Sequence, residues 1–344
     1  MYKKILILLS VLFCLCGCSD QKLEQAYTEG MQALEKEQYD EAITAFETVI
    51  EGQYRLPETY RAYGIAWLEK ESYPEAIAAF SRSLNEMETQ DLAFKKDVMY
   101  YLAEARLSYG ELEKAKAIYG DILEIEKDPQ AFYLRGKAYL VQNDFENAEK
   151  DFLRAVDGCE DYNLYINIYQ LYVEKNKTID GNQYLELALA MTPGTGEDYY
   201  QRGRIYDYQK NYEKAKEELI SSLKAEYADA MSLLGKIYLK MEDVTSARGM
   251  YQEYLAQGVN NARAYNGLAM CDIYEGKYDE ALENIQKGLA ENNEAENQGL
   301  LFNEIVAYEY KREFTTAKQK MQAYLKEYPE DAEALRENEF LSTR

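Results

Sequence analysis

The chain has 344 residues, of which 62 are acidic, 39 are basic and none is histidine, and its formal net charge is −23. A body this acidic repels nucleic acid, so we expect no nucleic-acid partner. The missing histidine excludes Ser-His-Asp and Cys-His nucleophiles and imidazole-based zinc sites. Paired carboxylates remain chemically able to catalyse a reaction, but no pair among so many acidic residues can be told from surface charge. We therefore expect no enzyme, no metal and no cofactor.

The first segment of the chain has the layout of a secretory signal peptide. Lys3 and Lys4 precede a mostly apolar run from Ile5 to Leu15, and small residues follow it. This is the order of regions in such signals. The apolar run is shorter than the about 20 residues that cross a bilayer as a helix. Its length disfavours the alternative, an uncleaved N-terminal membrane helix.

Three cysteines, Cys14, Cys16 and Cys18, stand on alternate positions at the end of this run. Thiolates that bind metals or carry out redox chemistry need polar or electropositive surroundings, which an apolar run does not offer. The stretch Leu15-Cys16-Gly17-Cys18 instead resembles the lipobox of bacterial lipoproteins, in which a leucine stands three places before an obligatory cysteine.

The lipobox resemblance implies that residues 1–17 are a signal peptide that is removed, and that residues 18–22 are a lipidated Cys18 and a short linker. Two or more acyl chains hold a protein stably on a bilayer. We therefore expect a protein that is anchored by lipid to the extracytoplasmic face of a membrane. That face is the outer side of the cell membrane, or the periplasm and outer membrane in a two-membrane bacterium.

A motif recurs along the rest of the chain with a period near 34 residues, which is typical of a solenoid of repeats. Each copy has a bulky residue, an alanine three places later and a large apolar residue four places beyond, as in YDEAITAF at 39–46. Most copies carry another small residue twelve places before the alanine. Apolar residues recur at helical spacing in two segments around a short polar turn, which predicts a helical hairpin. The alanines are Ala42, Ala76, Ala115, Ala148, Ala215, Ala247, Ala281 and Ala317.

The repeat resembles the tetratricopeptide repeat, whose 34-residue hairpins carry small residues on both helices and often a proline near the end, as at Pro193 and Pro329. The resemblance covers residues 23–331 in nine copies. It implies an all-α, right-handed superhelical solenoid of about nine helix-turn-helix repeats. The polar helical segment 332–344 is expected to be a capping helix, because the last unit of a solenoid needs a polar outer face.

The fifth copy departs from the pattern. Tyr169 and Gly181 stand where a small residue and the alanine are expected, so this hairpin is predicted to be looser. The stretch PGTGED at 193–198 follows directly and is either a hinge or an ordinary turn between repeats.

In tetratricopeptide proteins the first helix of each repeat lines a concave face, and such faces bind peptides or helices. Carried over to this chain, the resemblance gives a candidate partner-binding groove with several basic side chains. A basic, tyrosine-flanked strip favours acidic segments. The alternative is that these side chains pair with nearby acidic residues and stay solvated. The groove residues are Tyr100, Tyr133, Lys137, Asn167, Tyr200, Arg204, Lys236, Lys240, Asn266 and Tyr274.

Two further cysteines, Cys159 and Cys271, lie several copies apart, too far to form a disulfide with each other. Cys271 is predicted to be a core residue. Taken together, the sequence predicts a non-catalytic scaffold that binds other envelope or exported proteins or peptides. The alternative is a receptor for a short peptide or small ligand held in the groove.

Overall fold

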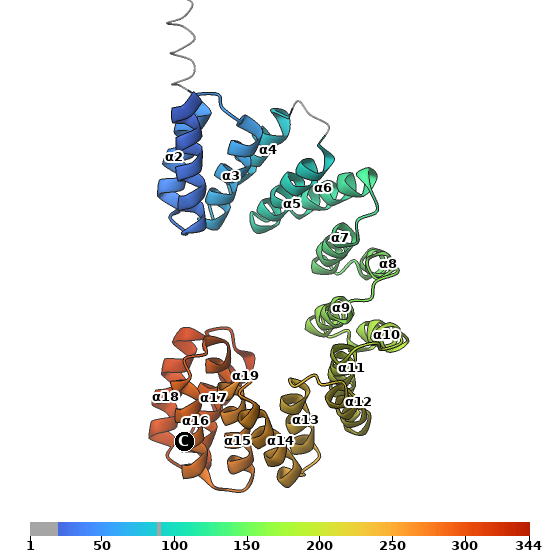
Figure 1. The fold of residues 1–344 in the computed structure, drawn as a ribbon, viewed down its shortest axis with the longest axis vertical. Coiled ribbons are helices and arrows are strands. Elements are labelled where there is room, and N and C mark those ends of the chain that lie inside the picture. Colours follow the sequence, from blue (N-terminus) through green and yellow to red (C-terminus); the bar gives the residue numbers. More distant parts are fainter. Residues whose placement is uncertain (1–19, 88–90) are drawn as a thin grey trace, which may run out of the picture. The chain divides into compact units, whose positions relative to one another are not determined.

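The structure is a computed structural model that describes residues 20–87 and 91–344. All regular elements in these residues are helices, shown in Figure 1. The first covers residues 20–35 and so begins within the predicted linker 18–22. The others are α2 (Tyr39–Glu51), α3 (Leu56–Glu69), α4 (Tyr73–Asn85), α5 (Leu92–Ser108), α6 (Leu112–Ile125), α7 (Pro129–Val141), α8 (Phe145–Ala155), α9 (Tyr162–Glu174), α10 (Thr178–Leu189), α11 (Gly196–Tyr208), α12 (Tyr212–Lys224), α13 (Ala230–Lys240), α14 (Val244–Gln257), α15 (Asn261–Tyr274), α16 (Tyr278–Ala290), α17 (Glu294–Tyr310), α18 (Phe314–Glu327) and α19 (Ala332–Ser342).

Consecutive helices of the described residues pair into nine hairpins, beginning with helix 20–35 and α2 and ending with α17 and α18. Helix α19 follows the last hairpin and packs against α18. The predicted fold class, an all-α solenoid of about nine helix-turn-helix repeats and a C-terminal helix, is confirmed. None of the described helices is both long enough and apolar enough to cross a membrane. The predicted signal peptide and Cys18 lie outside the described residues.

The chain divides into two compact units, 1–159 and 160–344. The described part of the first unit ends with α8, and the second begins with α9. The segment 193–198 lies inside the second unit, before α11. There the Thr195 Oγ1 atom accepts a hydrogen bond from the Asp198 amide at 3.1 Å, and the Asp198 carboxylate accepts one from the Thr195 amide at 2.8 Å. These bonds cap α11, and a hinge at 193–198 stays a prediction.

The turn inside every hairpin has the same backbone conformation. The residue two places before the second helix has a positive φ, for example 59° at Glu37 and 61° at Asn143. Left-handed residues end helices in this way because the following amide can then bond back to the last turn, as the Gln38 amide does to the Ala33 carbonyl at 2.9 Å. Because this left-handed residue stands two places before the second helix in every hairpin, the polar turns have a similar length in all copies. The nine residues are Glu37, Glu71, Gly110, Asn143, Asn176, Lys210, Glu242, Gly276 and Arg312.

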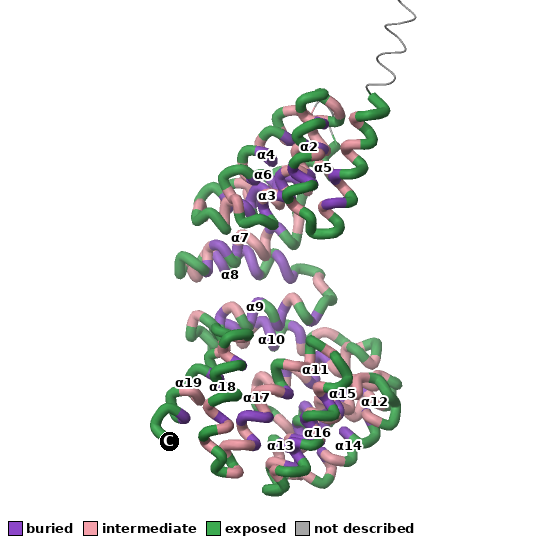
Figure 2. The backbone as a smooth tube through the Cα atoms, turned by 90° about the vertical axis from the view of Figure 1, so that its left-hand side faces the viewer, coloured by how far each residue is buried: buried purple, intermediate pink, exposed green. Residues whose placement is uncertain are grey.

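The small residues of the motif are where the two helices of a hairpin meet. A Cβ atom added at Gly64 would lie 2.6 Å from Phe80 Cε1, and one added at Gly136 would lie 2.8 Å from the ring of Phe152. In both hairpins the glycine stands sixteen residues before the aromatic ring that covers it. This periodic contact places one large buried side chain in the core of each hairpin, and Figure 2 shows the buried residues on the sides of the helices that face their neighbours.

In the fifth hairpin, the two helices come into close contact at a different residue. Tyr169 replaces the small residue of its first helix and is 7% exposed. The small residue is instead Gly181 on α10, where an added Cβ would lie 2.8 Å from Tyr172 Cβ and 3.1 Å from the Tyr169 carbonyl oxygen. The helices α9 and α10 therefore touch at Gly181, and the expected loosening of this hairpin is not seen.

Buried ion pairs join the helices of some hairpins at the same sixteen-residue spacing. In the fourth, Arg135 donates two hydrogen bonds to Asp151, from Nε to Oδ2 at 2.7 Å and from Nη2 to Oδ1 at 2.8 Å. In the sixth, Arg202 Nε donates to Glu218 Oε1 at 3.0 Å. Because Asp151 is only 5% exposed, removing Arg135 would leave this carboxylate buried without its two-bond contact.

Candidate partner-binding site

The ten predicted groove residues all lie on the first helix of a hairpin. Tyr100 is on α5, and Tyr133 and Lys137 are on α7, in the first unit. The second unit carries the other seven. Their role in binding stays a prediction, but their surroundings separate those that face solvent from those that pack. The seven are Asn167 on α9, Tyr200 and Arg204 on α11, Lys236 and Lys240 on α13, and Asn266 and Tyr274 on α15.

Two of the predicted residues from neighbouring hairpins, Tyr100 and Lys137, line one pocket of about 570 Å³. We call it the α5–α7 pocket, because its walls come from these two helices, with α6 contributing between them. Its lining is mixed, with an apolar part and a polar rim. The lining residues are Tyr100, Glu104, Leu107, Ser108, Leu112, Tyr119, Gln130, Leu134, Lys137, Ala138 and Val141.

The tyrosines of this pocket are fixed in place by packing. The rings of Tyr100 and Tyr119 lie 6.4 Å apart between centroids, with planes at 46°. Burial raises the pKa of Tyr119 to about 12, and burial together with the nearby Asp128 carboxylate raises the pKa of Tyr100 above its usual range. Both phenols therefore stay neutral at physiological pH, and they contribute mainly their rings to the pocket, because the Tyr100 hydroxyl is buried and Tyr119 is 1% exposed.

Lys137 is exposed at the edge of the pocket and forms no ion pair within residues 20–87 and 91–344. Glu104 lines the same pocket, but its carboxylate does not come within ion-pair distance of the Lys137 ammonium. In a chain with a net charge of −23, an unpaired ammonium beside apolar side chains is a local attraction for a carboxylate.

The basic residues of the second unit are engaged within the protein. Lys240 forms an ion pair with Asp207 and lies 5.5 Å above the ring of Tyr212, and Lys236 Nζ lies 4.0 Å from Asp207 Oδ2. The alternative interpretation, in which basic groove residues pair with nearby acids, is thus confirmed for these two lysines.

Arg204 has neutral partners instead. Its Nη1 atom donates to the side-chain oxygens of Asn163 at 2.9 Å and Gln201 at 2.6 Å. Each partner is a neutral side-chain amide. Arg204 lines neither the α5–α7 pocket nor the pockets described below, so among the predicted groove residues Lys137 is the one that brings an unpaired charge to a described pocket.

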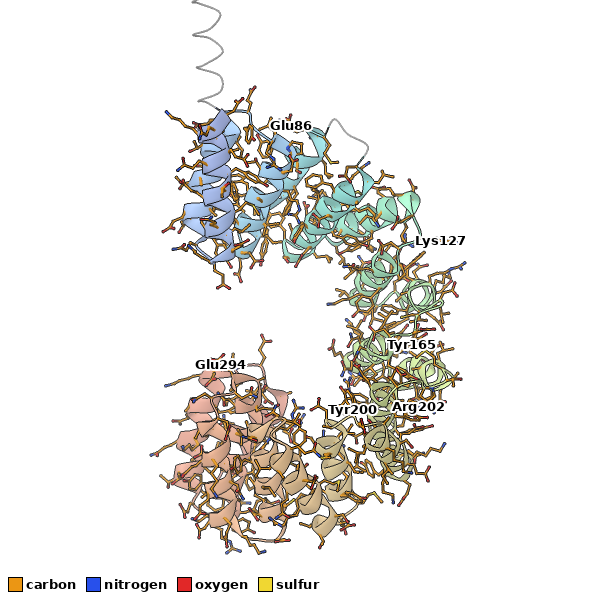
Figure 3. All side chains as sticks on the ribbon, viewed as in Figure 1. Glu86, Lys127, Tyr165, Tyr200, Arg202 and Glu294 are labelled. Atoms are coloured by element: carbon orange, nitrogen blue, oxygen red, sulfur yellow. The ribbon has the colours of Figure 1, made fainter. Side chains whose placement is uncertain are left out.

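Tyr133 and Tyr200 are packing residues as much as surface residues. The Tyr133 ring lies 6.0 Å from Phe152, and the Tyr200 ring lies 5.3 Å from Tyr227. Burial raises the pKa of Tyr200. Figure 3 labels Tyr200 and Arg202, which stand two residues apart on α11 and therefore lie on different sides of the helix.

Tyr274 lines a pocket of about 370 Å³ in the second unit, formed by α15, α17 and the first residue of α16. We call it the tyrosine pocket. Asn266 lies next to it and accepts a hydrogen bond at 2.7 Å from the amide of Asn303, a lining residue. The pocket is lined by Met270, Ile273, Tyr274, Tyr278, Asn303, Val306 and Tyr310.

A larger pocket of about 720 Å³ lies on α7 and α8 of the first unit. None of the predicted groove residues lines it. Its wall contains Arg135 and Asp151, whose charges are bound to each other in the buried ion pair described above. Asn167 is exposed on α9 and lines none of these three pockets.

Sequence reasoning missed several lining residues because it considered first helices only. Tyr278 begins a second helix, and Leu112 also begins one, yet each lines a pocket between two first helices. A signal for them exists in the sequence: both are the bulky residue three places before the repeat alanine.

Within the described residues, no group of three or more metal-binding side chains is arranged to hold an ion.

Four segments of the chain match the tetratricopeptide repeat family, at residues 27–91, 100–163, 200–258 and 232–296. They cover more than half of the chain and leave out 164–199, where the divergent fifth copy lies. A comparison with curated proteins finds no match.

Solved structures similar to this chain include two other tetratricopeptide repeat proteins. One, from Parabacteroides merdae, is 14% identical, covering 82% of this chain and 99% of its own, with a TM-score of 0.42. The C-terminal part of another, from Cytophaga hutchinsonii, is 16% identical, covering 70% and 99%, with a TM-score of 0.44. MamA from Desulfovibrio magneticus is 18% identical, covering 48% and 92%, with a TM-score of 0.41. On the strength of its four repeat matches, the chain belongs to the tetratricopeptide repeat family.

Proposed function

We propose that this protein is a lipid-anchored, non-catalytic scaffold of the bacterial cell envelope that captures an exported polypeptide through the first helices of its repeats. Tetratricopeptide domains generally bind other proteins and are typically not catalysts. The anchor is the lipid on Cys18, which the lipobox-like stretch before it supports. Because the first described helix begins at residue 20, the anchor would hold the first hairpin close to the membrane.

The observation that carries the proposal is the α5–α7 pocket. It combines apolar side chains, the rings of Tyr100 and Tyr119, and the ammonium of Lys137, which forms no ion pair in the described residues. An acidic segment with an aliphatic side chain beside a carboxylate fits this combination, because the side chain is desolvated while the carboxylate meets the ammonium. The remaining basic groove residues contribute less, since Lys236 and Lys240 already share Asp207.

The test is crosslinking of the membrane-anchored protein in its own cells, with the wild type compared to Lys137→Glu. Lys95→Glu is the matched control, because Lys95 is an exposed lysine on α5 that does not line the pocket. We expect an exported protein that is captured by the wild type and by Lys95→Glu and is lost with Lys137→Glu. Binding of that protein in vitro should weaken as salt increases.

The same experiment decides against the proposal if all three proteins yield the same crosslinks. A low-mass adduct in place of a protein would favour the second candidate function, a receptor for a short peptide or small ligand, for which the bounded volume of about 570 Å³ is the supporting observation.

The anchor has its own test. Replacing Cys18 by Ala should release the protein from the membrane fraction, because the acidic body offers no electrostatic attraction to anionic lipids. A Cys18→Ala protein that remains in the membrane fraction would contradict the lipid anchor.

A further inference from the structure

The tyrosine pocket exposes aromatic rings that the repeat does not need for packing. Tyr274 is 57% exposed and Tyr310 is 60% exposed, whereas the motif aromatics Tyr119 and Tyr251 are 1% and 3% exposed. The ring of Tyr310 stacks on that of Tyr278, with centroids 5.7 Å apart and planes at 11°. In Figure 1, α15, α16 and α17, which carry these rings, lie together in the second unit. Exposed rings that line a pocket are typical of a contact surface.

No lining residue of this pocket is charged, although the chain as a whole has a net charge of −23. The charged residues that follow the two stacked rings or lie near them are engaged with one another. Lys311 Nζ lies 2.7 Å from Asp279 Oδ1 and 3.0 Å from Glu313 Oε1. A partner of this surface is therefore recognised by shape and neutral hydrogen bonds and not by charge.

The polar groups of the pocket include donors that remain available. Asn303 uses one N–H on the side-chain oxygen of Asn266 at 2.7 Å. An amide carries two N–H groups and a phenol carries one O–H, so a second N–H of Asn303 and the exposed tyrosine hydroxyls can donate to a ligand. A ligand that offers acceptors and flat apolar faces together fits these groups.

A polyproline II segment has these properties. Its carbonyl groups make no internal hydrogen bonds, its proline residues have no N–H to satisfy, and its rings are apolar faces. Its conformation is already ordered before binding, which reduces the entropy lost on docking to a rigid aromatic surface. We propose that the tyrosine pocket, carried by Tyr274, Tyr278, Asn303 and Tyr310, is a docking site for a proline-rich, uncharged segment of a partner protein.

This site rests on the proposed function as a protein-binding scaffold, but it uses different residues in a different unit from the α5–α7 pocket. The partner segment is also of opposite character, uncharged and proline-rich where the first pocket favours an acidic one. The two sites can therefore be tested and can fail separately.

The experiment measures binding of a fluorescein-labelled decaproline peptide to the purified full-length lipidated protein in detergent micelles. A labelled Gly-Ser decapeptide is the peptide control. We expect decaproline to bind and Gly-Ser not to bind, and the affinity to change little with salt because no charge is involved. Tyr310→Ala and Tyr274→Ala should each weaken binding by about tenfold or more.

Tyr109→Ala is the matched protein control, since Tyr109 is 53% exposed and lies outside the pocket. Tyr310→Phe keeps the ring and removes only the hydroxyl, so it should bind decaproline more weakly than the wild type and more tightly than Tyr310→Ala, which separates a lost contact from a lost fold. Lys137→Glu should bind decaproline as the wild type does, so failure of the α5–α7 proposal would leave this result unchanged.

Three results would overturn the inference: no decaproline binding by the wild type, equal binding by Tyr310→Ala, or a strong decrease of binding with salt. Binding of a neutral oligosaccharide such as maltohexaose, with no affinity for decaproline, would assign the pocket to a sugar and also contradict it.

Discussion

The ring of Tyr251 is clamped between two glycines, and this geometry makes a sharp prediction. Tyr251 lies on α14 and is 3% exposed. A Cβ atom added at Gly235 on α13 would lie 2.7 Å from Tyr251 Cζ and 2.9 Å from Cε2. The ring also lies so close to Gly267 of α15 that a Cβ atom added there would be 2.2 Å from Tyr251 Cε1. The ring therefore cannot move away from position 235 without meeting the next hairpin.

We expect Gly235→Ala to destabilise the protein. Overpacking of a well-filled core lowers the free energy of unfolding by about 1–3 kcal/mol. The better helix propensity of alanine raises it by about 1 kcal/mol. The net expected loss in the free energy of unfolding is up to about 2 kcal/mol. Gly249→Ala is the matched control, because Gly249 is an exposed residue of α14 whose added Cβ meets nothing within 4 Å. That change should stabilise the protein by about 0.5–1 kcal/mol.

The assay is urea unfolding of the purified protein followed by circular dichroism at a helix wavelength, with the midpoint compared among the three proteins. Repeat proteins unfold through neighbouring units, so hydrogen exchange of α13 and α14 shows whether the loss is local to the altered hairpin. A midpoint for Gly235→Ala above that of the wild type, as expected for Gly249→Ala, would refute the clamp, since both substitutions would then act through helix propensity alone.

The remaining predictions concern buried polar groups. Asp151→Ala should lower the free energy of unfolding by about 2–3 kcal/mol, because it removes the carboxylate bound to the half-buried Arg135; urea unfolding measures it. Burial and the carboxyl of Glu337 on α19 raise the pKa of Glu309 on α17 to about 8. The protonated form of Glu309 is therefore the one that the folded protein favours, so α19 should be held most strongly at acidic pH. The free energy that holds α19 in place should fall by about 1 kcal/mol as the pH rises through 8. Hydrogen exchange of α19 should show this change, and Glu309→Gln should remove it. Burial raises the pKa of the Cys271 thiol to about 12, so iodoacetamide should label Cys271 only in the unfolded protein, as mass spectrometry would detect.

Much of the fold could be predicted from the sequence, because the packing inside a hairpin repeats. The alanine and glycine positions mark where the helices touch, and the sixteen-residue spacing from Gly64 to Phe80 or from Gly136 to Phe152 identifies the buried ring. Cys271, predicted to be a core residue from its place in the middle of a helix, is 0% exposed.

The fifth copy shows where this reasoning fails. The pattern predicts a loose hairpin because Tyr169 is too large for its position. The structure moves the close contact to Gly181 and Tyr172, a rearrangement that periodicity cannot indicate because it departs from the repeated pattern. The division of the chain at 159–160 likewise has no marker in the repeat motif.

The sequence by itself determined the number of hairpins, their turns and the small residues that allow the helices to touch, since each depends on contacts within one repeat. Only the tertiary structure decided the state of the surface residues. It pairs Lys236 and Lys240 with Asp207, leaves Lys137 without an ion pair in the described residues, and gathers Tyr274, Tyr278 and Tyr310 in one pocket. Those outcomes depend on contacts between neighbouring hairpins, where exposed side chains are free of the periodic packing constraint and their partners stand about one repeat away in the chain.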